Sequence, residues 1–299
     1  MQTFYLTHLY PEKMSLYGDF GNIITLKHRL SLVGWQVVYQ PVEMHENLPE
    51  QTDFYFLGGG QDKEQLMIFE DLLTKKIRLQ DDLDKGIAML AICGGYQLLG
   101  ESFLTSEGEL IQGLGILPVK TVAPTTRERC VGNIVLKCLI PELENLQLIG
   151  FENHSGRTHF VENSNLSPVD VEITEQNSKL EQNYDQNYEQ NSSNSTKKLQ
   201  HKNQKVGQIK PLGQVIVGFG DNTDKIHEGC VWKNVVGSYL HGPILAKNPR
   251  LANWLLKRAL ITKQNNSKTQ FPIPNFDQID DSIADLMRQN ILKQVAINS

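Results

Sequence analysis

Apolar runs alternate with amphipathic stretches along the first hundred residues. Three of these runs have the length of single buried strands: 3–9, 35–42 and 53–57. Apolar residues at helical spacing follow the first run, from Ile23 to Val33, and the third, from Leu66 to Leu73. Alternating strands and helices are typical of right-handed βαβ units. The pattern therefore predicts an α/β fold with a mostly parallel central sheet flanked by helices.

The stretch from Gly86 to Gly100 holds a candidate nucleophile. Its apolar run ends in Cys93-Gly94-Gly95 and passes into helix-forming residues, which predicts a buried parallel strand, a sharp turn and a helix start. The two glycines give room for a strained backbone at the tip. A helix N-terminus favours thiolate over thiol, and its free N–H groups can stabilise an oxyanion. A buried cysteine beside a glycine turn is the purely structural alternative.

Beyond residue 102 the pattern changes to shorter strand candidates separated by turns, at 115–122, 131–138, 146–152, 215–219 and 231–240. These strands predict an extra antiparallel region packed beside the parallel sheet, rather than a second doubly wound domain. A helix over 249–260 is expected to cover this region.

Two segments differ from the rest of the domain predicted for residues 1–262. Asn, Gln and Ser make up 16 of the 32 residues from 174 to 205, so 174–206 is predicted to be a disordered polar insertion. Residues 263–299 are predicted to form a linker and a C-terminal amphipathic helix, which docks on its own domain or on a partner. The apolar stripe of this helix consists of Ile283, Leu286, Met287 and Ile291.

Composition argues against several classes of protein. With 299 residues, 39% hydrophobic residues and a net charge of −5, the chain is expected to be soluble and to lack a general nucleic-acid surface. No apolar stretch approaches the roughly 20 residues that span a bilayer, and no secretory signal is evident, so a cytoplasmic location is expected. The cysteines, at 93, 130, 138 and 230, have neither Cys-x-x-Cys spacing nor zinc-finger histidines. Neither a disulfide framework nor a metal site is expected.

A cysteine nucleophile needs a base that is usually distant in sequence. Of eight histidines, His241 is the first candidate, because it follows the apolar run 235–240 and so occupies a strand-end loop like that of Cys93. His154, within the segment 150–158, is its competitor. A satisfied structural histidine at a strand end is the alternative for either residue.

Several motifs together resemble one family. They are Ala91-Ile-Cys93-Gly94-Gly95-Tyr-Gln97, the turn Gly58-Gly59-Gly60, Asp19-x-Gly-Asn22, Gly150-Phe-Glu-Asn-His154-x-Gly-Arg157-Thr and Tyr239-Leu-His241-Gly242. In this order they resemble class I glutamine amidotransferases of the cobyric acid synthase type. They are more closely similar to the GatD-type subunits of lipid II isoglutaminyl synthases. The resemblance extends from residue 3 to about 262, apart from the polar insertion.

The resemblance implies a mechanism for two residues. Cys93 would attack the side-chain amide of L-glutamine, and His241 would protonate the leaving ammonia and then activate water against a γ-glutamyl thioester. Most class I amidotransferases carry a glutamate two residues after the histidine, whereas Pro243 occupies that position here. A carboxylate elsewhere in the chain or one from a partner can replace it, and we expect the partner to supply it.

The resemblance also assigns substrate-binding residues. Arg129 would pair with the carboxylate of glutamine, a task that suits a planar guanidinium, with Arg127 as a nearby rival. The backbone N–H groups of Gly60 and Gly94 are the candidates for an oxyanion hole. Either arginine can instead be a simple surface charge.

The sequence contains no Gly-x-x-x-x-Gly-Lys-Ser/Thr loop, and Gly60 is followed by Gln61-Asp62-Lys63 rather than by a dinucleotide fingerprint. No cofactor is therefore expected in this chain. By the resemblance, ATP and Mg belong to a MurT-type, Mur-ligase-like subunit in a heterodimer. That subunit would amidate the α-carboxyl of D-glutamate in the lipid II stem peptide during peptidoglycan synthesis. Two alternatives remain: a glutaminase for another synthetase, such as a corrinoid one, and a non-catalytic regulator of a Mur-like ligase.

Overall fold

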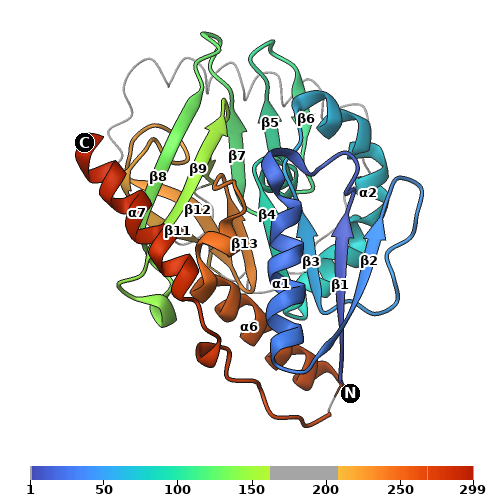
Figure 1. Ribbon diagram of the computed structural model, residues 1–299. Helices are drawn as coiled ribbons and strands as arrows, with labels where there is room; N and C mark the ends of the chain where they lie inside the picture. Colours follow the sequence, from blue (N-terminus) through green and yellow to red (C-terminus); the bar gives the residue numbers. More distant parts are fainter. Residues whose placement is uncertain (1, 162–207, 268, 299) are drawn as a thin grey trace. The chain divides into compact units, whose positions relative to one another are not determined.

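The central feature is a nine-stranded mixed sheet, and the computed structural model describes it within residues 2–161, 208–267 and 269–298 (Figure 1). Neighbouring strands pair in parallel across one half of the sheet, which contains β2 (Gln36–Val42), β1 (Thr3–Leu9), β3 (Phe54–Leu57), β4 (Ala88–Ile92) and β13 (Val235–Ser238). The other half continues antiparallel with β12 (His227–Trp232), β11 (Lys210–Val217), β8 (Cys130–Cys138) and β9 (Gln147–His154). The predicted α/β class and parallel sheet are confirmed.

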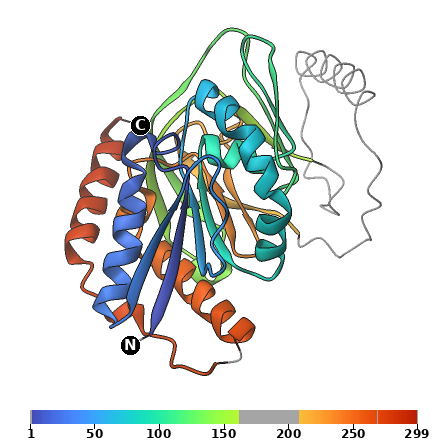
Figure 2. The same cartoon turned by 90° about the vertical axis from the view of Figure 1, so that its right-hand side faces the viewer.

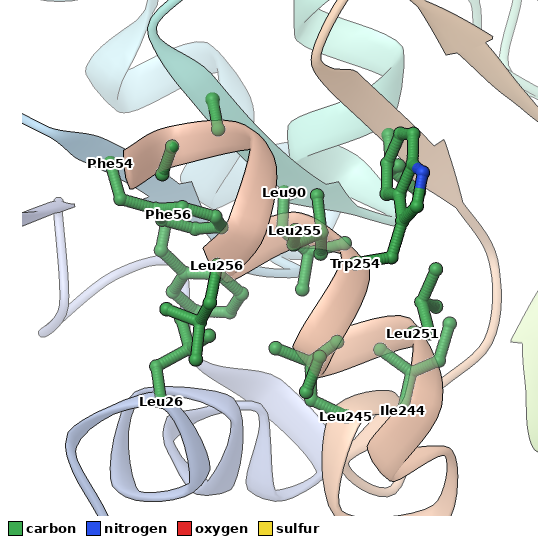
Figure 3. Close-up of a cluster of buried hydrophobic side chains, with 14 of the residues drawn as sticks. Leu26, Phe54, Phe56, Leu90, Ile244, Leu245, Leu251, Trp254, Leu255 and Leu256 are labelled. Atoms are coloured by element: carbon green, nitrogen blue, oxygen red, sulfur yellow. The ribbon is translucent and has the colours of Figure 1, made fainter. Parts of the chain in front are cut away.

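Alternate residues of the central strands bury into opposite faces, as the two-residue period of a strand requires. Phe54 and Phe56 pack with α1 (Phe20–Leu32) and α6 (Pro249–Ser267), as the close-up in Figure 3 shows. Tyr55 and Leu57 pack in the other core, together with α2 (Asp62–Asp84). Figure 2 shows α1 and α2 on opposite faces of the sheet. A strand buried on both faces reads as a continuous apolar run, which explains the sequence pattern.

A second sheet and the remaining helices complete the described chain. A second sheet has the order β10 (Arg157–Phe160), β7 (Val119–Val122), β5 (Ser102–Leu104) and β6 (Leu110–Gln112). The remaining helices are α3 (Gly94–Leu99), α5 (Ile244–Lys247), α7 (Ser282–Asn298) and the 3-10 turns Leu16–Gly18, Pro141–Leu143 and Phe276–Gln278. The antiparallel region predicted for the second half of the sequence is therefore present, divided between the two sheets.

Several predicted boundaries are wrong. The strand predicted for 215–219 spans Lys210–Val217. The single strand predicted for 231–240 is an antiparallel hairpin of β12 and β13, because Lys233 adopts a left-handed φ of 53° and turns the chain. The strand predicted for 115–122 begins only at Val119. The helix predicted to end at Leu260 continues to Ser267, which shortens the predicted linker. The predicted insertion 174–206 lies outside the described residues.

The C-terminal helix α7 packs on its own domain. Ile291 and Leu292 contact the buried side chains of Val135 and Ile149. Arg288 donates to the carbonyl oxygen of Gln147 at 2.6 Å and so ties the helix to the start of β9. The stripe predicted for this helix is therefore split, because Ile291 faces the domain whereas its other three residues, Ile283, Leu286 and Met287, are exposed.

Candidate active site

Cys93 lies at a strained elbow between β4 and α3. Its backbone has φ 51° and ψ −109°, a conformation that L-residues rarely adopt. The N–H of Cys93 donates to the carbonyl of Ser238 on the neighbouring strand at 2.8 Å, and its own carbonyl accepts the first helical bond from Gln97. The predicted strand, turn and helix start are confirmed, and the strain falls on the residue whose side chain is the candidate nucleophile.

Three functional groups meet around Gly59 in the turn between β3 and α2. A Cβ placed on Gly59 would lie 3.0 Å from Cε1 of His241, 3.3 Å from Oδ2 of Asp19 and 3.4 Å from Cβ of Cys93. These side chains come from three different connections, after β13, β1 and β4 respectively. Because carboxyl ends of parallel strands share one edge of the sheet, the topology brings these distant residues together. The structure thus places His241 beside Cys93, as the sequence predicts.

His241 forms a buried pair with Asp19. Nδ1 of His241 lies 3.2 Å from Oδ1 of Asp19, and both side chains are almost fully buried, with exposed fractions of 1% and 0%. The second carboxylate oxygen of Asp19 accepts the N–H of Gly59 at 2.9 Å, which fixes the carboxylate. Nε2 of His241 is buried and has no hydrogen-bond partner among the described residues. It is therefore free to exchange a proton with a reacting group.

A carboxylate of this chain contacts His241, although the usual glutamate is missing. Pro243 does occupy the usual glutamate position, and its ring packs against Gly21, where a Cβ would come within 2.5 Å of it. Asp19 instead approaches the imidazole from the loop before α1, 222 residues away in sequence. Asp19 is therefore the candidate for the orienting carboxylate within this chain, whereas a carboxylate supplied by a partner stays a prediction. The sequence offered one signal, because Asp19 follows the first parallel strand at the same sheet edge as the glycine turns.

Charges around the imidazole set its protonation. Burial lowers the pKa of His241, but the sulfur of Cys93 and the carboxylate of Asp19 together raise it to about 10. The backbone of His241 is also held, because it exchanges two hydrogen bonds with Phe151 of β9 at 2.8 and 3.2 Å. At neutral pH this arrangement favours an imidazolium beside the sulfur of Cys93.

The two glycines predicted to form an oxyanion hole lie against each other. A Cβ on Gly94 would be 3.0 Å from the nitrogen of Gly60 and 2.8 Å from its oxygen, so only a glycine permits this approach. Gln65 donates to Gln97 at 2.9 Å and to the carbonyl of Gly60 at 3.4 Å. Gln97 in turn donates to the hydroxyl of Tyr239, two residues before His241. This series of buried hydrogen bonds links α2 to α3 and to the segment that leads to His241.

Arg129 is exposed and precedes β8. It donates from Nε and Nη2 to Asn153, at distances from 2.8 to 3.2 Å. Its charge also acts on Asp62, just past Gly60: burial raises the pKa of Asp62, whereas Arg129 lowers it. Arg127, the rival, pairs with Glu107, and both of these side chains are exposed. The charge of Arg129 therefore acts at the start of α2, where the carboxylate of Glu107, the partner of Arg127, opposes it.

The contacts of His154, the competing base, indicate a structural role. Its Nδ1 lies 2.8 Å from the carbonyl of Gly156, and its ring stacks on Tyr239 at 3.9 Å. Burial lowers the pKa of His154 despite the nearby carboxylate of Glu152. The ring supports Tyr239 and the strand leading to His241, and none of the contacts described for His154 reaches Cys93.

The described residues contain no group of three or more His, Cys, Asp or Glu side chains arranged to hold a metal ion. All four cysteines are free. Within the part of the chain that the structure describes, no helix has the length and apolar character needed to cross a membrane.

Comparison with known proteins assigns the family. Residues 6–196 match the CobB/CobQ-like glutamine amidotransferase domain. The chain is 35% identical to the lipid II isoglutaminyl synthase (glutamine-hydrolyzing) subunit GatD of Streptococcus pneumoniae, over 86% of this chain and 81% of that protein. It is 31% identical to the subunit GatD of Staphylococcus aureus, over 84% and 82%. A probable cobyric acid synthase of Methanopyrus kandleri is 31% identical, over 40% of this chain and 25% of that protein. With its cysteine elbow and buried histidine, this chain belongs to the CobB/CobQ-like glutamine amidotransferases.

Proposed function

We propose that this chain is the glutaminase subunit of a lipid II isoglutaminyl synthase. The observation that carries the proposal is the convergence of Cys93, His241 and Asp19 around Gly59, in a chain similar to GatD subunits over most of its length. A cysteine, an imidazole and an orienting carboxylate suffice for acyl transfer through a covalent intermediate.

The proposed reaction begins when the sulfur of Cys93 attacks the side-chain carbonyl of glutamine. The C–S bond forms first and places the negative charge on the carbonyl oxygen. As this tetrahedral intermediate collapses, the C–N bond breaks, and His241 gives its proton to the departing nitrogen, which leaves as ammonia. The neutral imidazole then accepts a proton from water, whose oxygen attacks the γ-glutamyl thioester. Glutamate leaves, and the sulfur and the imidazolium are restored. The N–H groups of Gly60 and Gly94 are proposed to hold the oxyanion in both steps.

Arg129 is proposed to bind the α-carboxylate of glutamine. Replacing it with alanine is expected to raise KM for glutamine by about 10- to 100-fold, the range for losing a charge-assisted hydrogen bond, with kcat changed by less than about threefold. Arg127→Ala is the matched control, since its partner is the exposed Glu107, and it is expected to leave KM unchanged. Steady-state glutaminase kinetics of both variants test this assignment, which is wrong if Arg127→Ala raises KM and Arg129→Ala does not.

Amide formation from a carboxylate needs an activated acyl group. The proposal therefore places ATP and Mg on a partner of the MurT type, a Mur-ligase-like subunit, which receives ammonia from this chain. The partner would amidate the α-carboxyl of D-glutamate in the lipid II stem peptide.

Isotope transfer tests this division of labour. The co-purified complex is supplied with [amide-¹⁵N]glutamine, ATP and lipid II, and the stem peptide is analysed by mass spectrometry. We expect ¹⁵N in the α-amide of D-isoglutamine, and unlabelled ammonia present in equal amount is expected to dilute the label only slightly if transfer is direct. Capture of a different synthetase, with label appearing on a corrinoid amide, would favour the second function, for which similarity to part of cobyric acid synthases is the supporting observation.

A further inference from the structure

The loop between β1 and α1 is fastened to the glycine turn on both sides of Tyr17. Leu16 donates its N–H to the carbonyl of Gly59 at 3.1 Å, and the N–H of Gly59 donates to Asp19 at 2.9 Å. The residues between these two attachments, Tyr17 and Gly18, therefore have little freedom to move away from the catalytic histidine.

Tyr17 has a strained backbone at this point. Its φ is 54° and its ψ is 27°, in the left-handed region that an aromatic residue rarely occupies, and Gly18 follows with a φ of 79°. Backbone strain of this kind persists where the surrounding structure imposes it, and it is concentrated at functional sites. At this strained position the ring of Tyr17 lies against the imidazole of His241.

The ring of Tyr17 covers the imidazole. The two ring centroids are 4.8 Å apart with an interplanar angle of 65°, an edge-to-face contact. Tyr17 is 48% exposed whereas the side chain of His241 is 1% exposed, so the phenol ring meets the solvent at this position. Asp19 holds the imidazole at Nδ1, and Phe151 holds its backbone. Tyr17 provides a further contact, and it is the solvent-facing one.

We propose that Tyr17 is a positioning residue, whose ring excludes bulk water from the imidazole of His241 and holds it in the orientation needed for proton transfer. The inference rests on the proposed glutaminase reaction. Excluding water strengthens the attraction between the imidazolium and the carboxylate of Asp19, because charges interact more strongly where the dielectric is low. Without the Tyr17 ring, the imidazole of His241 would remain in the site but could tilt, so that its proton would no longer point at the reacting group.

Two variants of Tyr17 and one control distinguish the contribution of its ring from the contributions of its hydroxyl and of the strained backbone. Tyr17→Phe keeps the ring, and no hydrogen bond of the Tyr17 hydroxyl is found among the described residues, so it is expected to behave like the wild type. Tyr17→Asn removes the ring but tolerates the left-handed backbone. Phe20→Ala is the matched control, because Phe20 is similarly exposed, at 42%, and packs on His8 and Tyr39 rather than on His241.

The test combines kinetics of the complex with chemical modification of the histidine. For Tyr17→Asn we expect kcat of glutamine hydrolysis to fall about tenfold with KM within about twofold, while Tyr17→Phe and Phe20→Ala keep wild-type values. Carbethoxylation of His241 by diethyl pyrocarbonate, followed by peptide mass spectrometry, is expected to be severalfold faster in Tyr17→Asn alone, with the buried His154 as internal reference.

Unchanged carbethoxylation in Tyr17→Asn would overturn the shielding role, and faster carbethoxylation with unchanged kcat would overturn the positioning role. A loss of kcat in Tyr17→Phe equal to that in Tyr17→Asn would assign the effect to the hydroxyl and would also overturn the proposal. If the wild-type complex hydrolyses no glutamine, the proposed function fails as well. Since the modification assay does not use glutamine, it distinguishes the two failures.

Discussion

Cys93→Ala is expected to abolish glutamine-dependent amidation while ammonia-dependent amidation by the same complex persists. Removing a covalent nucleophile typically costs about 10⁵-fold or more in kcat, so glutamine turnover should fall to the limit of detection. Ammonia added directly bypasses the thioester, and activation of the acceptor is proposed to occur on the partner. The measurement is the rate of stem-peptide amidation with glutamine and, separately, with ammonium chloride.

Cys230→Ala is the matched control for this variant. Cys230 is a fully buried cysteine on β12, and burial raises its pKa, so it is an inert core thiol and not a nucleophile. The control is expected to retain both activities, with some loss of stability. If Cys93→Ala retains both activities as well, the chain is a scaffold or regulator of the ligase and not a glutaminase. If it loses both, the variant has disrupted the complex, and Cys93→Ser is the variant to compare.

The cysteine elbow was predictable because its signals are local. An apolar run, a cysteine and two glycines occupy consecutive positions, and together they require a strand, a strained tip and a helix start. His241 was predictable for the same reason, since it directly follows a strand-like run. The hairpin turn at Lys233 was not predicted. The positive φ of this lysine is imposed by the pairing of β12 with β13, and lysine is not a residue type that indicates a turn.

Contacts between distant segments account for the other differences. The spacing of apolar residues predicts a helix near the C-terminus, but it does not show that Ile291 would face the domain while Ile283 remains 84% exposed. Arg288 contributes to that choice through its bond to Gln147, which sequence periodicity does not encode. The role of Asp19 as the carboxylate that contacts His241 was not predicted. In the family pattern this carboxylate lies two residues after the histidine, whereas Asp19 lies near the other end of the chain.

Asp19→Asn is expected to lower kcat by about 10³-fold or more, as loss of the orienting carboxylate does in a catalytic triad. The amide oxygen of the new side chain can still accept from Gly59, which would turn its NH₂ group toward Nδ1 of His241. Nδ1 must then accept a hydrogen bond, so the proton of a neutral imidazole moves to Nε2, the wrong tautomer for a base. The rate of glutamine hydrolysis by the isolated chain and by the complex measures this loss.

The pH dependence of this variant tests the electrostatic part of the mechanism. In the wild type, the sulfur of Cys93 and the carboxylate of Asp19 raise the pKa of His241 to about 10, against the effect of burial. The imidazolium that protonates the departing nitrogen is therefore lost only as the pH rises through that value. Removing the charge of Asp19 lowers this pKa, and the alkaline limb of kcat/KM should therefore move to lower pH. Asp53→Asn is the control: it removes a mostly buried carboxylate bound to Lys263 and Tyr5, and it should leave the alkaline limb in place. A normal rate and an unshifted limb for Asp19→Asn in the complex, with a defect only in the isolated chain, would mean that a partner carboxylate orients His241 after all.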